Sequence, residues 1–163
     1  MTKRKSYIIM AIVVVVGIVI DLVTKILFAN ALAGEDGIVV IPNFFEFVYV
    51  ENTGAAYGML GGNIVLLIII TLVFIVGFVV YDYFNHANNW WYVLGMSLIL
   101  SGAVGNFLDR IFLGYVRDFI SIRLFSFVFN IADLLITVGV ICFVIYLIIS
   151  IVRENREKKG NNK

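Results

Sequence analysis

The chain has 163 residues, of which 62% are hydrophobic and only 14% charged, and its mean hydropathy is +1.04. Soluble domains are nearer a quarter charged and half apolar, so a water-soluble globular fold is excluded and lipid must cover much of the surface. The formal net charge of +1 gives no sign of nucleic-acid binding, and the single cysteine rules out an internal disulfide. The length predicts a single domain, residues 1–163.

Four stretches are apolar and long enough to cross a bilayer as a helix, which takes about 20 residues. They cover about residues 7–28, 64–81, 90–112 and 131–152. The basic start followed by an apolar run also fits a cleavable signal peptide, but Asp21 and Lys25 near the end of that run argue against one. The sequence therefore predicts an all-α membrane protein with four transmembrane helices.

The basic residues predict how these helices are oriented. They cluster before the first span and after the fourth, whereas the connection between the first two spans has neither lysine nor arginine. By the positive-inside rule, both termini are predicted to be cytoplasmic, with the connections 31–62 and 113–130 outside. The charged tail, residues 153–163, is predicted to be disordered and cytoplasmic.

The outer connections have the composition of strands. Residues 44–51 are rich in aromatic and branched side chains with partial alternation, and residues 123–129 have a similar composition. We expect a small extracytoplasmic β-sheet, built mainly between the first and second helices.

Charged residues in membrane spans are functional candidates because lipid penalises them. In this chain they collect at one depth, the outer ends of the spans, as Asp21, Lys25, Asp109, Arg110 and Asp133. Asp118 lies at the same leaflet, in the connection just before the fourth span. The inner half of the bundle has no comparable group in the sequence. One polar cluster at one leaflet predicts a site at the outer membrane boundary.

Two of the charged pairs also have a structural interpretation. Asp21 and Lys25 are four residues apart, so we expect them to neutralise each other, with Lys25 extending outward toward the headgroups. Asp109 and Arg110 are expected to brace the end of the third helix, where a cation suits the helix dipole. Both pairs are therefore predicted to support the fold.

Asp118 and Asp133 form the pair most suited to chemistry. Asn130 and Asp133 have the spacing of a helix N-cap and its partner, but a cap does not explain why Asp118 lies at the same leaflet. Two neighbouring carboxyl groups tend to share one proton. The ionised member can take a proton from water while the protonated member polarises a scissile carbonyl. We expect Asp133, at the positive end of the fourth helix, to be the more often ionised.

Other peptidase chemistries lack their residues. The only histidine, His86, cannot supply the His-Glu-x-x-His motif of a metallopeptidase, and no Gly-x-Ser-x-Gly serine is present. The carboxylate pair needs neither a metal nor a cofactor. The residues alone also allow two non-enzymatic functions, proton or cation translocation and the binding of lipoproteins without cleavage.

Five motifs in chain order resemble those of the bacterial lipoprotein signal peptidases, the signal peptidase II family. They are Asp21-x-x-x-Lys25, Asn52-x-Gly54-Ala55-Ala56, Gly105-Asn106-x-x-Asp109-Arg110, Arg117-Asp118 and Phe129-Asn130-x-Ala132-Asp133. The similarity covers about residues 7–152. The chain has Leu22 where the family usually has Gln and Leu134 where it usually has Ser, and its stretch from Asp118 to Asp133 is short.

The resemblance implies an aspartic endopeptidase of the bacterial cytoplasmic membrane, without a metal, whose site lies at the outer leaflet. Its substrates would be prolipoproteins whose lipobox cysteine carries a diacylglyceryl group, cut before that cysteine, and globomycin-type inhibitors would bind. Asp118 and Asp133 would be the catalytic dyad, and Asp21 and Lys25 a structural polar pair. The substrate-binding and supporting residues would be Asn52, Gly54, Asn106, Asp109, Arg110 and Asn130. We expect a monomer that contacts membrane lipids and no nucleic acid.

Overall fold

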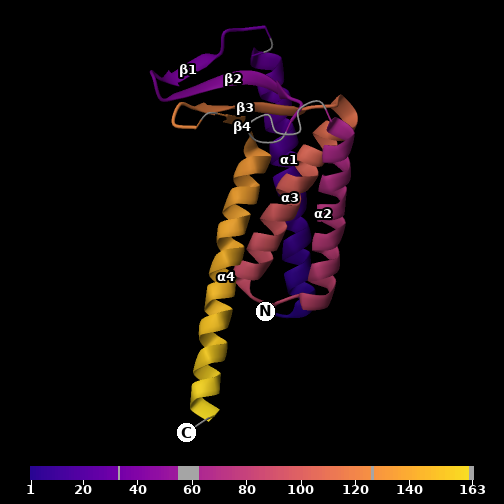
Figure 1. Ribbon diagram of the computed structural model, residues 1–163, viewed down its shortest axis with the longest axis vertical. Helices are drawn as coiled ribbons and strands as arrows, with labels where there is room; N and C mark the ends of the chain where they lie inside the picture. Colours follow the sequence, from indigo (N-terminus) through magenta and orange to yellow (C-terminus); the bar gives the residue numbers. More distant parts are fainter. Residues whose placement is uncertain (33, 55–62, 126, 162–163) are drawn as a thin grey trace.

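The computed structural model describes residues 1–32, 34–54, 63–125 and 127–161. In this part of the chain four helices run side by side, and a small sheet covers one end of the bundle (Figure 1). The helices are α1 (Lys3–Leu32), α2 (Ile64–Asn85), α3 (Trp90–Leu113) and α4 (Ile131–Asn161). Each is long and apolar enough to cross a membrane, which confirms the predicted four-helix membrane fold.

All four helices extend beyond the predicted apolar spans, and the difference is largest in α4. Where the sequence predicts a disordered tail, the structure continues α4 to Asn161, while residues 162–163 lie outside the described residues. Ion pairs one helical turn apart, Arg153 with Glu157 and Glu154 with Lys158, support this extension. At 1.5 Å per residue α4 is about 46 Å long, so its last turns reach well past a hydrocarbon core of about 30 Å.

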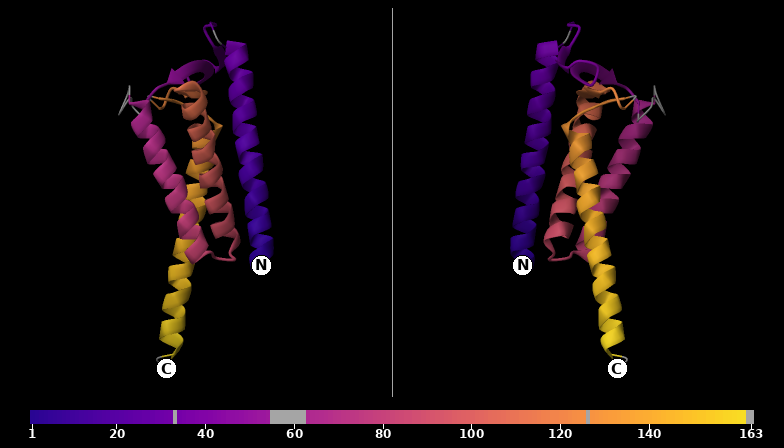
Figure 2. Two further views of the ribbon diagram at one scale, coloured as in Figure 1. Left: turned by 90° about the vertical axis from the view of Figure 1, so that its right-hand side faces the viewer. Right: turned by 90° about the vertical axis from the view of Figure 1, so that its left-hand side faces the viewer.

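α3 is the buried helix of the bundle, and it lies between α1 and α2 in Figure 2. Small residues on its faces allow close contact: a Cβ at Gly102 would collide with the backbone carbonyl of Ala132 in α4, and one at Gly105 with the carboxylate of Asp21 in α1. Small side chains let membrane helices approach closely. The close approach brings the polar ends of α1, α3 and α4 together.

The sheet has four antiparallel strands in the order β1 (Ile38–Ile41), β2 (Phe45–Asn52), β3 (Val116–Ile122) and β4 (Val128–Phe129). The predicted small sheet is thus confirmed, but half of its strands come from the connection between α3 and α4. The predicted strand over residues 123–129 is wrong except at its end. Residues 116–122 form the long strand instead, because they pair with β2 along most of its length.

Aromatic packing attaches the sheet to the bundle. The ring of Phe28, near the end of α1, lies 4.5 Å from that of Phe47 in β2 and 4.3 Å from that of Phe119 in β3, measured between centroids. The antiparallel register pairs Val50 with Asp118, so the last residues of β2 run beside the candidate catalytic acid. The sheet therefore positions residues of two connections, α1 to α2 and α3 to α4, over the ends of the helices.

Both termini lie at the end of the molecule opposite the sheet (Figure 1). This arrangement agrees with a chain whose two ends share one side of the membrane. Which end faces the cytoplasm stays a prediction from the positive-inside rule.

Candidate active site

Asn130 brings the two candidate catalytic acids together. Asp118, on β3, is only 2% exposed, and Asp133 is in the first turn of α4. The Asn130 side chain donates from Nδ2 to Oδ1 of Asp118 at 2.6 Å, and its backbone N–H donates to Oδ2 of Asp133 at 3.2 Å. One residue thus contacts both carboxyl groups, which come from separate elements.

The capping interpretation of Asn130 also describes its geometry. The backbone N–H of Asp133 donates to Oδ1 of Asn130 at 3.1 Å, which completes a reciprocal pair of side-chain and backbone hydrogen bonds at the start of α4. The cap and the candidate catalytic site are therefore built from the same atoms. Its use as a cap holds Asn130 rigidly, so that its Nδ2 is directed at Asp118.

Asn106, on α3, connects this pair to the rest of the buried network. Its Nδ2 donates to Oδ1 of Asp133 at 2.8 Å. Its Oδ1 accepts from Nδ2 of Asn130 at 3.1 Å and from Nζ of Lys25 at 2.9 Å. Both oxygens of Asp133 thus accept hydrogen bonds from N–H donors, which fix the position of its carboxyl group.

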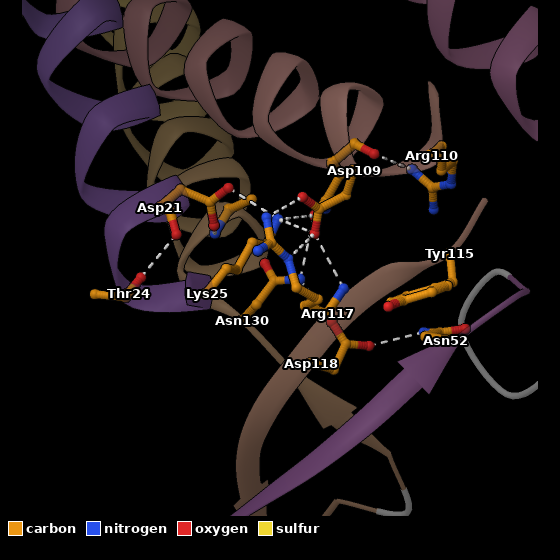
Figure 3. Close-up of polar contacts among 12 residues, drawn as sticks. Asp21, Thr24, Lys25, Asn52, Asp109, Arg110, Tyr115, Arg117, Asp118 and Asn130 are labelled. Carbon is orange, nitrogen blue, oxygen red and sulfur yellow. Dashed lines mark hydrogen bonds and ion pairs between the residues drawn. The ribbon is translucent and has the colours of Figure 1, made fainter. Parts of the chain in front are cut away.

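Asn52, at the end of β2, contacts the other acid. Its Nδ2 donates to Oδ2 of Asp118 at 2.8 Å, and its Oδ1 accepts from the backbone N–H of Gly54 at 3.0 Å (Figure 3). Gly54 therefore orients Asn52, and Asn52 orients Asp118. The remaining residues of this motif, 55–56, lie outside the described residues.

Lys25 is at the centre of an ion-pair network just below the acids. Its Nζ lies 2.8 Å from Oδ2 of Asp21 and 3.5 Å from Oδ2 of Asp109, and its side chain is fully buried. The expectation that Lys25 extends to the headgroups is wrong, because α3 supplies two partners for its ammonium group. Asp21 does more than balance that charge: its Oδ1 accepts the backbone N–H of Ala132 in the first turn of α4 at 2.8 Å.

Arg117 is the partner of Asp109, a contact that the sequence did not predict. Its Nη2 lies 2.6 Å from Oδ1 of Asp109, while its Nε and backbone N–H donate to Oδ2 at 3.2 and 3.1 Å (Figure 3). The chain turns back between the two at Gly114, whose φ of 80° is in the left-handed region that favours glycine. Asp109 thus ties the end of α3 to β3 one residue before Asp118.

Arg110 points away from the Asp109 cluster in Figure 3. Its Nη1 makes one long hydrogen bond, 3.4 Å, to the backbone carbonyl of Asn106. Its Nε is buried and has no hydrogen-bond partner among the described residues. Its positive charge interacts with the negative charges of Asp133 and Asp118. Arg110 is therefore a hydrogen-bond donor near the two acids, and other protein groups use only part of its donor capacity.

The pKa of Asp118 is raised from 3.8 to about 7, mainly by burial and also by the negative charge of Asp133. The donors Asn52 and Asn130 act in the opposite direction and only partly offset this rise. Near neutral pH, Asp118 therefore holds its proton for much of the time, which is required of a group that donates a hydrogen bond to a carbonyl. No three His, Cys, Asp or Glu side chains of the described residues are grouped so that they could hold a metal ion.

The fold and this site define an integral membrane protein with a pair of linked carboxyl groups beneath a sheet at one end of its bundle. A family model described as "Signal peptidase (SPase) II" matches residues 13–149. The chain belongs to the signal peptidase II family and is therefore a membrane peptidase.

Individual relatives agree with this assignment. The chain is 46% identical over 134 residues to the lipoprotein signal peptidase of Caldanaerobacter subterraneus subsp. tengcongensis, covering 81% of this chain and 91% of the relative. It is 40% identical over 140 residues to that of Clostridium novyi, covering 83% and 95%. A solved bacterial membrane enzyme superposes with a TM-score of 0.75 at 34% identity, covering 90% of this chain and 88% of the enzyme.

Proposed function

We propose that this peptidase removes the signal peptide from diacylglyceryl-modified prolipoproteins, cutting before the lipobox cysteine with Asp118 and Asp133 as an aspartic dyad. Family membership supports the removal of signal peptides from lipoprotein precursors. The observation that carries the mechanism is the convergence of both carboxyl groups on Asn130. We place the reaction at the outer leaflet of the bacterial cytoplasmic membrane, because the positive-inside rule puts the sheet-covered end outside.

Both acids accept hydrogen bonds from N–H donors, so their roles are assigned from burial and from the helix dipole. Asp133, at the positive end of α4, acts as the base that takes a proton from the attacking water. Asp118, which burial keeps protonated near neutral pH, gives its proton to the carbonyl oxygen as the tetrahedral diol forms. When the C–N bond breaks, Asp133 passes its proton to the leaving amine and Asp118 recovers its own. The cycle returns both acids to their starting states.

Arg110 is the side chain best placed to hold the substrate beside the dyad. Its side chain is only partly buried and its Nη1 makes one long hydrogen bond, 3.4 Å, so the guanidinium group has further N–H donors for a peptide carbonyl. Asn52, Asn106 and Asn130 are already occupied in orienting the acids. We extend to this chain the family expectations of inhibition by globomycin and of activity as a monomer.

Cleavage of defined precursors tests the function. The purified protein in lipid nanodiscs is incubated with a lipoprotein precursor in two forms, with and without the diacylglyceryl group on its cysteine, and the products are weighed by mass spectrometry. We expect the lipidated precursor alone to be cut, immediately before the modified cysteine. Equal cleavage of both forms or a cut elsewhere would contradict the proposed specificity. Binding without cleavage would point to a lipoprotein-binding function instead.

The pH dependence of this cleavage is expected to report on Asp118. Because the acid must be protonated, kcat should fall as the pH rises through about 7, the value to which burial raises its pKa. Asn52 donates to the ionised form and so lowers that pKa, which means that Asn52→Leu should move the alkaline limb to higher pH. The exposed neighbour Thr53→Val should leave the limb in place. An unchanged limb in Asn52→Leu would show that Asp118 does not set it.

A further inference from the structure

A second polar site lies at the end of the bundle opposite the dyad. A cavity of about 580 Å³ opens between the first turns of α1 and the last turns of α2. Its lining residues are Lys3, Tyr7, Val79, Asp82, Tyr83 and Phe84. The peptidase chemistry uses none of them. A volume of this size is typical of small-ligand sites in proteins.

Asp82 is held rigidly at this cavity. Its Oδ1 accepts the hydroxyl proton of Tyr92 at 2.9 Å and pairs with Nδ1 of His86 at 2.8 Å. Its Oδ2 makes no hydrogen bond to any of the described residues, although Asp82 is only 7% exposed. The carboxylate is thus fixed through one oxygen and has the other available for a ligand.

A chain of contacts behind Asp82 explains why it is so well fixed. His86 hydrogen-bonds Ser6 through Nε2 and stacks on Tyr7 with 4.1 Å between ring centroids. Ser6, His86 and Asp82 are connected in the order of a catalytic triad. Ser6 is completely buried, however, so its hydroxyl cannot reach a substrate. The three residues therefore brace the ends of α1 and α2 and position the Asp82 carboxylate.

The other lining groups complement a ligand with two opposite charges. The Lys3 ammonium, 6.0 Å from the centroid of the Tyr7 ring, supplies a positive charge at the cavity. Asp82 supplies a negative one, and the rings of Tyr7, Tyr83 and Phe84 are surfaces that attract ammonium groups. A phosphate would pair with Lys3, and a primary amine a few bonds away with Asp82 and the rings.

The site lies where a membrane lipid would present such a group. The cavity is at the end of two helices long enough to span the bilayer, and α2 beside it exposes Val76 and Val80 to the surroundings. Acyl chains would cover these apolar side chains while the headgroup enters the cavity. We propose that this cavity binds the phosphoethanolamine headgroup of a phospholipid, with the phosphate on Lys3 and the amine on Asp82.

Native mass spectrometry of the full chain tests the proposal. Detergent-purified protein is titrated with phosphatidylethanolamine and, separately, with phosphatidylglycerol, which has the phosphate but no amine. We expect phosphatidylethanolamine to be retained at least about fivefold better. Lys3→Glu should remove most of that retention, whereas Lys5→Glu, the same charge change on an exposed residue outside the cavity, should not. Free phosphoethanolamine at the same concentration should not displace the lipid, because it lacks the acyl chains.

Several outcomes would overturn the lipid site. Equal retention of the two lipids would show that the amine is not recognised, and equal losses in Lys3→Glu and Lys5→Glu would show only general charge attraction. Displacement by free phosphoethanolamine would make the ligand a soluble one. Asp82→Asn gives a second check: it should equalise the two lipids while thermal unfolding shows that the bundle is still folded.

Discussion

Replacing either Asp118 or Asp133 by asparagine is expected to lower kcat for cleavage of a lipidated precursor by at least about 10³-fold. Asparagine at position 118 cannot give a proton to the scissile carbonyl, and at position 133 it cannot take one from water. Because both proton transfers belong to the same step, the formation of the diol, the double variant should lose little more than either single variant. Rates are measured from the mass of the cleaved product under saturating substrate.

Two controls separate lost chemistry from lost folding. Asp36→Asn removes an exposed carboxylate shortly before β1 and should leave kcat unchanged. Asp118→Asn should itself be well folded, because the folded state holds the Asp118 proton more tightly than the unfolded chain does. Activity of either dyad variant within about tenfold of the unmodified enzyme would contradict the aspartic mechanism.

The sign of the stability change in Asp118→Asn follows from its pKa. Burial raises the pKa of Asp118 to about 7 in the folded protein from 3.8 in its ordinary state, so ionisation above pH 7 costs stability. Asparagine avoids this cost, although its single oxygen can accept from only one of the two donors, Asn52 and Asn130. The stability of the variant relative to the unmodified protein should therefore rise as the pH increases from about 3.8 to 7, and it should be constant below about pH 3.8, where Asp118 is protonated in both the folded and the unfolded state. This profile shows that the loss of activity at pH 8 is not caused by unfolding.

Sequence analysis predicted the location of the candidate site better than it predicted the hydrogen bonds and ion pairs within it. Lipid penalises charge so strongly that acids at the ends of separate spans must gather at one depth, which placed Asp118 and Asp133 near each other without any contact being known. The capping geometry of Asn130 was also visible, because a cap is local in sequence. What could not be seen was that the same side chain contacts Asp118, since that depends on where β3 passes the start of α4.

Contacts between elements account for most of what sequence analysis missed. Arg117 lies on Asp109 only because the chain reverses at Gly114, and the run of charges Asp109, Arg110 and Arg117 does not reveal which cation is the partner. His86 lies in the short connection between the second and third apolar spans, and nothing in the sequence indicates that its side chain contacts residues of three helices. A spacing of four residues predicts a pair within one helix, and it cannot say whether a neighbouring helix provides a further partner.

Removing the buried cation Lys25 is expected to destabilise the protein by about 3–5 kcal/mol. In Lys25→Met the carboxylates of Asp21 and Asp109 lose their shared ammonium group, and Arg117 remains to neutralise only Asp109. Lys5→Met, an exposed lysine of the same helix, should change stability by no more than about 0.5 kcal/mol. Thermal unfolding in one detergent compares the two variants.

A second substitution distinguishes an unpaired buried charge from lost packing. If the cost in Lys25→Met is the uncompensated Asp21 carboxylate, then adding Asp21→Asn should recover part of the stability, because an asparagine Oδ1 can still accept the N–H of Ala132. If the cost is packing alone, the double variant should be no more stable than Lys25→Met. The double variant should regain a smaller share of the cleavage activity than of the stability. In this variant Oδ1 of Asn106 still lacks its Lys25 donor, and Asn106 orients Asp133. The buried lysine thus holds the fold and the catalytic geometry through different contacts, which these two measurements separate.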